Sequence, residues 1–366
     1  MSEPVNEPSS GPSSGPSSDT DLSAVLDGAV GRITLRRARK LNALTHPMVR
    51  AMLDALRRWQ HDERVKLILV EAEPGKAFCA GGDIGTMYRM GIDGDIDAVR
   101  RFFADEYRLN ALIARYPKPY VAIMDGITMG GGIGISAHGS HRIVTERSVL
   151  AMPECMIGLV PDIGATHLLA QAPGHLGEYA GLSGARLGPG DALHMGLADH
   201  HVPSERLDAL KAALTERADP AAIAPFAVPA GPSPFAERAG AIDALFGRAT
   251  LADVLTGLRS DQPLWMDETH QAIGKASPLS LRMTFELIRQ ARRDPGVEPA
   301  LMREYRFVAR AIERGDFLEG VRAVLIDRDG APGWRHAGVA DVGEKLLQEL
   351  QREAPGGDPL LDRVAG

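Results

Sequence analysis

Two glycine-rich segments have the residue types and the spacing that suit chemistry at a carbonyl group. Residues 78–83 read FCAGGD and residues 126–134 read GITMGGGIG. Each follows an apolar run of strand character, 65–70 and 120–124, and opens into a segment that can be helical, so backbone N–H groups should point at one spot. Glycine has no Cβ and lets a carbonyl oxygen approach the backbone, where two N–H donors stabilise developing negative charge. The two segments therefore predict an oxyanion hole.

A third segment, AMPE at 151–154, supplies an acid or base. Glu154 follows Pro153, which fixes the local backbone, and precedes an apolar stretch that should desolvate its carboxylate and raise its pKa. An exposed loop glutamate is the alternative interpretation. Eight residues later Asp162 follows Pro161, where it could also be the N-cap of a helix that extends to Gln171. Two carboxylates placed close together would push their pKa values apart.

These segments resemble the enoyl-CoA hydratase/isomerase (crotonase) superfamily, and the resemblance runs from about Gly31 to about Trp334. Three stretches resemble its branch of 3-hydroxyisobutyryl-CoA hydrolases: GITMGGGIGIS at 126–136, AMPECMIGLVPDIG at 151–164 and FLEGVRAVLIDRD at 317–329. The resemblance implies an enzyme that hydrolyses a short 3-hydroxyacyl-CoA thioester, a step in valine breakdown.

The resemblance also assigns roles to single residues. It implies that the N–H groups of Gly82 and Gly131 form the oxyanion hole, and that Glu154 and Asp162 are catalytic, with Glu154 as nucleophile or as base for water. Substrate binding would involve Gly131, Glu154 and Asp162, together with Glu106 near the hydroxyl of the acyl group. Most glutamates on such a helix are surface charges, which is the alternative for Glu106.

The resemblance places the basic run 36–40 near the phosphates and adenine of CoA, with Arg37 and Lys40 as the CoA-binding residues. A solvated loop is the alternative interpretation of this run. Coenzyme A would enter as part of the substrate, so we expect no separate cofactor. We also expect no metal, because His138, His141 and the pair at 200–201 lack the spacing and the third ligand of a zinc site.

One departure from the family pattern separates hydrolysis from hydration. The resemblance implies that a hydratase uses two glutamates, one at position 154 and one on the helix just after the GGG turn. This chain has Ile133 and Gly134 where that other glutamate would fall. Loss of one member of an acid–base pair typically lowers the reaction rate by about 10² to 10⁴, which argues against hydration. An enoyl-CoA hydratase or isomerase remains the first alternative, and a CoA-binding scaffold without catalysis is the second; the presence of both Glu154 and Asp162 argues against the scaffold.

Other local patterns are interpreted as structural. Ser136 lies in a sequence like a nucleophile elbow, but His138 replaces the last glycine of that motif, so we expect Ser136 to pack. The GGGIG run lacks the full spacing of a dinucleotide site. The two cysteines are too few for a disulfide framework, and Cys155 is expected to be a buried thiol.

Composition limits the partners. The chain has 366 residues, 44% of them hydrophobic, and a net charge of -7. An acidic chain is a poor match for nucleic acid, and no apolar run reaches the roughly 20 residues that span a membrane. The expected partner is an acyl-CoA substrate, with homo-oligomers as a further option. Residues 1–20 have no apolar core of a signal peptide and lack the arginines of a transit peptide, which favours the cytoplasm, or the mitochondrial matrix if the source is eukaryotic.

The elements that must position these residues are predicted to be α/β. Strand-like runs at 30–35, 65–71, 120–124, 141–145 and 148–151 alternate with helical periods at 47–61 and 96–114. The resemblance implies a crotonase-like spiral of repeated ββα units over 21–203. Apolar residues then recur at helical spacing, which predicts a C-terminal helical region over 204–350. Residues 1–20, with the repeat SSGPSSGPSS, and residues 351–366 are expected to be a disordered tail and a flexible tail.

Overall fold

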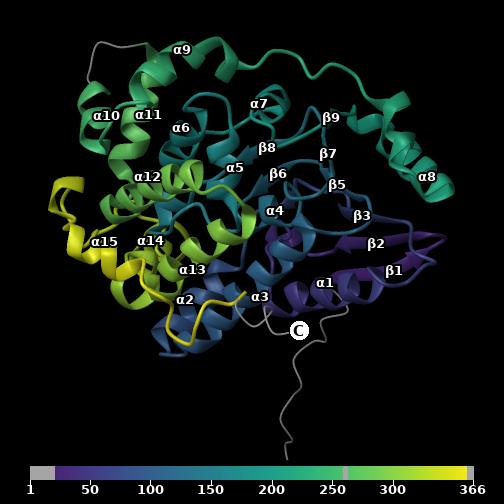
Figure 1. Ribbon diagram of the computed structural model, residues 1–366, viewed down its shortest axis with the longest axis horizontal. Coiled ribbons are helices and arrows are strands. Elements are labelled where there is room, and N and C mark those ends of the chain that lie inside the picture. The colour runs from purple at the N-terminus through teal and green to yellow at the C-terminus, as the bar shows by residue number, and fades with distance from the viewer. Residues whose placement is uncertain (1–20, 259–262, 361–366) are drawn as a thin grey trace, which may run out of the picture.

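The computed structural model describes residues 21–258 and 263–360, and its strands form two sheets (Figure 1). The larger sheet has the order β1-β2-β3-β5-β7-β9, in which β1 and β2 are antiparallel and the other neighbours are parallel. Its strands are Leu22–Asp27, Val30–Leu35, Leu67–Ala72, Tyr120–Met124, His141–Val144 and His200–His201. The smaller sheet is parallel, with the order β4-β6-β8, and consists of Ala77–Cys79, Ile127–Met129 and Val149–Ala151.

The first unit, β1 and β2 followed by α1 (His46–Trp59), lies in the larger sheet, and from β3 to β8 each turn of the spiral contributes one strand to each sheet and then a helical segment. After β3 and β4 come α2 (Ile84–Ile92) and α3 (Ile96–Ala114); after β5 and β6 comes α4 (Gly131–Gly134). After β7 and β8 come the short helix η3 (Glu154–Ile157) and α5 (Ala165–Gln171). This is the predicted arrangement of repeated ββα units, and the predicted α/β fold class with a C-terminal helical region is confirmed.

Local sequence explains where the early elements begin. Thr45 is the N-cap of α1, and its hydroxyl accepts a hydrogen bond from Met48 N at 3.4 Å. Asp95 caps α3 in the same way, through Ala98 N at 3.1 Å. Strand β5 is buried along its whole length, because it lies inside a parallel sheet that is covered on both faces.

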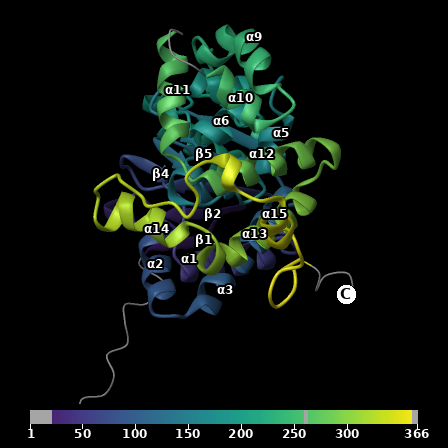
Figure 2. The same cartoon turned by 90° about the vertical axis from the view of Figure 1, so that its left-hand side faces the viewer.

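Helices make up most of the chain beyond residue 204. In both views α9, α10 and α11 lie at the top of the molecule, and α1, α2 and α3 lie at the bottom (Figures 1 and 2). The helices after α5 are α6 (Leu176–Ser183), α7 (Pro189–His194), α8 (Leu207–Arg217), α9 (Pro234–Phe246), α10 (Leu251–Gly257), α11 (Leu264–Lys275), α12 (Pro278–Arg293), α13 (Val297–Arg314), α14 (Phe317–Val321) and α15 (Glu344–Leu350). Between α8 and α9 lies the 3₁₀ helix η5 (Pro220–Phe226).

The C-terminal helices share their core with the N-terminal spiral. One continuous cluster of buried apolar side chains includes Ile33 in β2, Phe102 in α3, Leu169 in α5 and Phe307 in α13. Helix α13 packs on α3, and α12 packs on α5. The predicted boundary at residue 203 therefore marks a change in element type and does not separate two cores.

The last described residues lie against the body of the protein. Asp358 is buried and forms an ion pair with Arg306 of α13 at 2.6 Å, and Arg108 of α3 donates to Pro359 O at 3.1 Å. Leu360 is also buried. The prediction of a flexible tail from residue 351 does not fit these contacts, because buried charge pairing and apolar packing hold 351–360 in place. Residues 361–366 and the predicted tail 1–20 lie outside the described residues.

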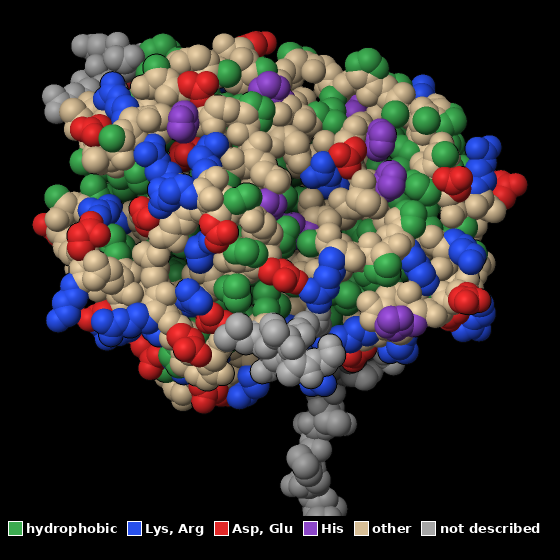
Figure 3. Space-filling view, in the orientation of Figure 1, with side chains coloured by type: hydrophobic (Ala, Val, Ile, Leu, Met, Phe, Trp, Pro, Cys, Tyr) green, Lys and Arg blue, Asp and Glu red, His purple; other side chains and the backbone are tan. Residues whose placement is uncertain are grey.

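Charged side chains of both signs are interspersed over most of the face that Figure 3 shows. Arginines also form ion pairs, for example Arg292 with the buried Glu178 at 2.7 Å and Arg303 with Asp294 at 2.7 Å. Among the described helices, none is long and apolar enough to cross a membrane.

Candidate active site

The smaller sheet brings the three predicted segments together. Strands β4, β6 and β8 are parallel, so their carboxyl ends meet at one edge of the sheet. Gly82 lies just after β4, Gly131 just after β6 and Glu154 just after β8. Because β6 is the central strand, Gly131 lies between the other two residues. This edge of the sheet lies near the centre of the molecule, where α4 begins (Figure 1).

The backbone around Gly82 turns its N–H group toward the site. Leu44 N donates to Gly81 O at 2.8 Å, and Asp83 N donates to Leu44 O at 2.9 Å. The intervening amide of Gly82 therefore points away from Leu44, as in any parallel bridge. Within the described residues this N–H has no hydrogen-bond acceptor.

Gly131 faces the same space. It is the first residue of α4, so its N–H lacks an acceptor inside the helix. A Cβ atom at this position would lie 3.4 Å from Gly82 N and 3.3 Å from Leu44 Cδ1. It would also collide with Glu106 Oε1. The two glycines thus border one small gap that a side chain at position 131 would fill.

Two glutamates flank this gap from different elements. Glu106 comes from α3, and Glu154 comes from η3; a Cβ atom at Gly130 would lie 2.9 Å from Glu154 Oε1. Their exposed fractions are 2% and 5%. In the part of the chain that the structure describes, Glu106 Oε1 and Glu154 Oε2 have no hydrogen-bond partner. Both carboxyl groups therefore keep an oxygen available for a ligand.

Asp162 also lies in this cluster, where its Oδ2 accepts a hydrogen bond from the buried hydroxyl of Tyr107 at 2.7 Å. The prediction that Asp162 caps α5 is wrong. The N-cap residue is Gly164, which makes no side-chain capping bond, and only the backbone oxygen of Asp162 accepts from Ala165 N, at 2.8 Å. The Tyr107 hydroxyl draws the carboxylate toward α3 instead.

Burial and mutual repulsion shift the acidity of the cluster. Burial raises the pKa of Glu154 well above its ordinary value, and the charge of Asp162 raises it further. Burial and then Asp162 also raise the pKa of Glu106 well above its usual range. Burial raises the pKa of Asp162 to about 6, although the Tyr107 hydrogen bond acts in the opposite direction. Groups that hold or release a proton near neutral pH suit acid–base chemistry.

The C-terminal region contributes a fourth carboxylate that the sequence did not reveal. Glu304 of α13 is fully buried and accepts hydrogen bonds from Gly164 N at 2.6 Å, Thr166 N at 2.9 Å and Thr166 Oγ1 at 2.5 Å. Burial raises its pKa to about 7. The sequence did contain a sign of this residue, since Glu304 lies on the same helix face as Leu301, Tyr305 and Val308. A charged side chain on a buried helix face needs hydrogen-bond partners, which points to a specific role.

Glu304 helps to hold a strained turn that follows Asp162. Ile163 has a φ of 60°, in the left-handed region that a β-branched residue rarely adopts. The ring of His138 donates from Nε2 to Ile163 O at 2.7 Å, and burial lowers the pKa of His138 to about 4, so the ring is neutral. His138, which the sequence excluded only as a zinc ligand, therefore has a structural role beside the site.

The basic loop lies next to Gly82 but is partly engaged by the protein. Arg37 forms ion pairs with Asp83 at 2.8 Å and Asp21 at 3.4 Å, and donates to Ala43 O at 3.0 Å. Lys40 is exposed on the following 3₁₀ turn, η2 (Ala38–Lys40). CoA binding by Arg37 and Lys40 stays a prediction, and Lys40 is the one whose side chain faces solvent.

Ser136 and Cys155, which were interpreted from the sequence as structural residues, are both buried. Ser136 is buried and donates to Gly132 O at 2.6 Å, so it packs as expected. Cys155 is a buried free thiol, also as expected, and burial raises its pKa to about 12. Within residues 21–258 and 263–360, no group of three or more His, Cys, Asp or Glu side chains could hold a metal ion.

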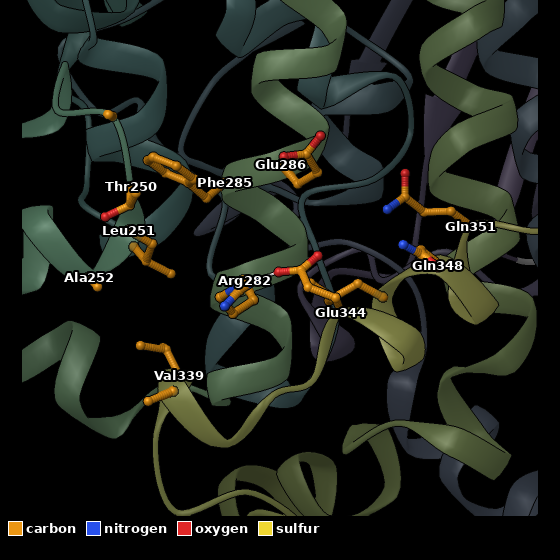
Figure 4. Close-up of a pocket in the computed structure, with 13 residues that line it drawn as sticks. Thr250, Leu251, Ala252, Arg282, Phe285, Glu286, Val339, Glu344, Gln348 and Gln351 are labelled. Atoms are coloured by element: carbon orange, nitrogen blue, oxygen red, sulfur yellow. Dashed lines mark hydrogen bonds and ion pairs between the residues drawn. The ribbon is translucent and has the colours of Figure 1, made fainter.

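A surface hollow of about 610 Å³ lies elsewhere, between α10, α12 and α15 (Figure 4). Arg282 and Glu344 form an ion pair in it, and Phe285 and Leu251 form part of its wall. None of the predicted site residues lines it.

Comparison with known proteins identifies the family. Residues 30–350 match the family described as Enoyl-CoA hydratase/isomerase. The chain is 37% identical to "3-hydroxyisobutyryl-CoA hydrolase, mitochondrial" of Danio rerio, over 88% of this chain and 87% of that protein. It is 38% identical to "3-hydroxyisobutyryl-CoA hydrolase 1" of Arabidopsis thaliana, over 87% of each.

Two solved structures are also similar. An enoyl-CoA hydratase from Rhodobacter sphaeroides is 42% identical, with a TM-score of 0.85, over 92% of this chain and 98% of that one. A carnitinyl-CoA dehydratase from Mycobacterium thermoresistibile is 40% identical, with a TM-score of 0.88 and the same coverage. The chain therefore belongs to the enoyl-CoA hydratase/isomerase family.

Proposed function

We propose that this protein hydrolyses 3-hydroxyisobutyryl-CoA to 3-hydroxyisobutyrate and coenzyme A. The observation that carries the proposal is the buried carboxylate of Glu154, which lies against Gly130 at the gap between Gly82 and Gly131. The names of relatives that are 37–38% identical over nearly nine tenths of the chain support the same substrate and reaction. In valine catabolism this reaction releases the free hydroxy acid.

The oxyanion hole would act on the thioester carbonyl. Its oxygen accepts hydrogen bonds from the N–H groups of Gly82 and Gly131, which stabilise the negative charge that develops when the carbonyl carbon becomes tetrahedral. The Glu154 carboxylate adds to that carbon, the C–S bond breaks, and CoA leaves as a thiolate that takes up a proton. Water then adds to the acyl–Glu154 anhydride and regenerates the carboxylate as the acid is released.

A direct route uses the same groups. In it, Glu154 removes a proton from water, the resulting hydroxide adds to the thioester carbon, and CoA leaves as before. Asp162 orients water or the acyl hydroxyl in either route. A single turnover in ¹⁸O-water separates them, because the anhydride route incorporates ¹⁸O into Glu154 when the anhydride is attacked at the protein carbonyl, and the direct route leaves Glu154 unlabelled.

Hydration of an enoyl-CoA is the second candidate function, and two observations favour it. Glu106 and Glu154 flank the gap from opposite elements, so the site does contain a pair of glutamates even though position 134 is glycine. In addition, the two similar solved structures are named as a hydratase and a dehydratase. Position 134 itself has no room for a side chain, because a Cβ atom there would lie 2.7 Å from Asn110 Nδ2 and 2.9 Å from Ile163 Cβ.

A two-substrate assay distinguishes the candidates. Release of the CoA thiol from 3-hydroxyisobutyryl-CoA is followed with a thiol-reactive dye, and hydration of crotonyl-CoA is followed by the loss of its enoyl absorbance. We expect rapid thiol release and little hydration. Rapid hydration without thiol release would overturn the proposed function.

The remaining partners are part of the same proposal. Lys40, with Arg37 behind it, would contact CoA phosphates at the mouth of the site, and the protein would need no cofactor beyond the CoA of its substrate. We propose that it acts in the cytoplasm, or in the mitochondrial matrix if the source is eukaryotic, with a homo-oligomer as a further option. Neither nucleic acid nor a membrane is expected as a partner.

A further inference from the structure

Asn110 is a buried polar residue that the proposed reaction does not yet use. It lies on α3 with no exposed surface, and neither its Oδ1 nor its Nδ2 has a hydrogen-bond partner among the described residues. A buried amide without partners costs free energy, so folded proteins rarely retain one without a functional reason.

Asn110 lies beside the site, one helical turn along α3 from Glu106. Asn110 is four residues beyond Glu106 on α3, so the two side chains share one helix face at a spacing of about 5–6 Å. Glu106 lies against Gly131, and Asn110 lies against Gly134, three residues further along α4. Helices α3 and α4 therefore present two matched levels: Glu106 with Gly131 at the oxyanion gap, and Asn110 with Gly134 one turn deeper.

We propose, on the basis of the proposed function, that Asn110 binds the hydroxyl group of the acyl chain and so sets the preference for hydroxylated thioesters. In the 3-hydroxyisobutyryl group the hydroxyl oxygen stands three bonds from the carbonyl carbon. With the carbonyl oxygen at Gly82 and Gly131, a chain of this length reaches the deeper level. A hydroxyl both donates and accepts, and a carboxamide offers the matching acceptor and donor.

This assignment makes Asn110 a specificity residue, which does not touch the bond that breaks. Removing the Asn110 amide should lower kcat/KM for thioesters that carry the hydroxyl, because their hydroxyl would be buried without a hydrogen-bond partner. Thioesters without the hydroxyl make no hydrogen bond to Asn110 and should be spared. The change should also not harm the free protein, since the amide has no protein partner to lose.

The test compares 3-hydroxyisobutyryl-CoA with isobutyryl-CoA in the unmodified protein and in Asn110→Leu, which has a similar shape. We expect kcat/KM for the hydroxylated thioester to fall by about 10- to 100-fold and that for isobutyryl-CoA to change by less than about 3-fold. The Tm should be unchanged or higher. Asn110→Ala gives a second measurement with less risk of overpacking against Gly134.

A matched control is Ser280→Ala. Ser280 of α12 is also fully buried, with a hydroxyl that has no partner in the described residues, and it belongs to no proposed part of the site. Its variant should keep both kcat/KM values.

The outcomes separate the inference from the proposed function. Equal losses on both thioesters, or a lower Tm in both Asn110 variants, would indicate a structural role and overturn the inference. An unchanged preference would also overturn it while leaving the hydrolase intact. If the unmodified protein hydrolysed neither thioester, the proposed function would fail, and this inference with it.

Discussion

At the scale of single residues, the acidity of Glu154 is the property on which the chemistry depends. Glu154→Gln removes the charge but keeps the shape, and one oxygen of this side chain has no protein partner to lose. We therefore expect a folded protein that binds CoA normally and turns over at least about 10²-fold more slowly. Thiol release and CoA titration measure the two properties. Near-normal turnover in this variant would remove Glu154 from the mechanism.

Gly131 should tolerate no side chain, even a methyl group. The Cβ of Gly131→Ala would enter the gap next to Gly82 N and displace the Glu106 carboxylate. Loss of one oxyanion donor typically lowers the rate by about 10² to 10³, and we expect a folded variant with a loss of that size. Gly188→Ala is the control, because a Cβ there meets nothing within 4 Å and its φ is -76°. A Gly131→Ala enzyme as fast as the control would place the oxyanion hole elsewhere.

Asp162 should set the pH at which Glu154 becomes active. The charge of Asp162 is among the causes that raise the pKa of Glu154, so Asp162→Asn should lower that pKa. The mechanism requires the ionised form of Glu154. The acidic limb of kcat/KM should therefore move to lower pH in Asp162→Asn, although the maximal rate falls. A pH–rate profile from pH 5 to 8 checks this, and an acidic limb that stays in place or moves to higher pH contradicts it.

At the scale of elements, α13 supports the site from the far end of the chain. Glu304 holds three donors of the turn 164–166, so Glu304→Ala would leave buried N–H groups without acceptors. We expect a loss of about 2 to 4 kcal/mol in the free energy of unfolding and a lower kcat, because the turn positions Asp162. Urea denaturation measures the first effect.

The matched control for this helix is Glu298→Ala, which removes an exposed glutamate from α13. It should stay within about 0.5 kcal/mol of the unmodified protein. Equal stability of the two variants would show that the buried hydrogen bonds of Glu304 are not needed by the turn.

Long elements were predictable from the sequence because their periodicity spans many residues. The helix at 96–114 and the strands at 30–35 and 120–124 have the predicted bounds. Strands β4 and β6 were not predicted, since three residues are too few to show an alternation of period two. These short strands, rather than the long apolar runs, directly precede the two glycine turns.

The site was predictable where it depends on local motifs and not where it depends on tertiary contacts. Gly82, Gly131, Glu154, Asp162 and Glu106 do come together. The partners Tyr107, Asn110 and Glu304 were missed, because only the packing of α3 and α13 brings them to the site. The same packing explains why Asp162 does not cap α5.

At the scale of the whole molecule, buried acids and buried histidines change the free energy of unfolding in opposite directions as pH rises. Folding raises the pKa of Asp162 from 3.8 to about 6 and that of Glu304 from 4.5 to about 7, so their stabilising contributions are lost as pH rises through those values. Folding lowers the pKa of His138 from 6.5 to about 4, so its contribution is lost as pH falls. His141 and His167 are shifted in the same direction.

We therefore expect the free energy of unfolding to fall as pH rises from about 4.5 to 8, because Glu106, Glu154, Asp162 and Glu304 keep protons in the folded state that the unfolded chain has released. The buried histidines offset only part of this fall, and only below about pH 6.5. The raised pKa of Glu154 extends the fall to higher pH, so Glu154→Gln should make it shallower. Urea denaturation at pH 5, 6.5 and 8 tests this. A rise between pH 6.5 and 8 would contradict it.

The packing of α13 on α3 has a consequence for synthesis of the protein. Arg100 of α3 donates to Ala309 O of α13, across a sequence separation of 209 residues. At about 5 to 20 residues per second, the ribosome needs on the order of 10 to 40 s to make the intervening chain. During that interval α3, which carries Glu106 and Asn110, can pack on α1 but lacks α13 on its other side, and the turn after Asp162 lacks Glu304. The nascent chain must therefore leave the α13-facing side of α3 uncovered until α13 has been made, so chaperones that bind exposed apolar segments should associate with it during this interval.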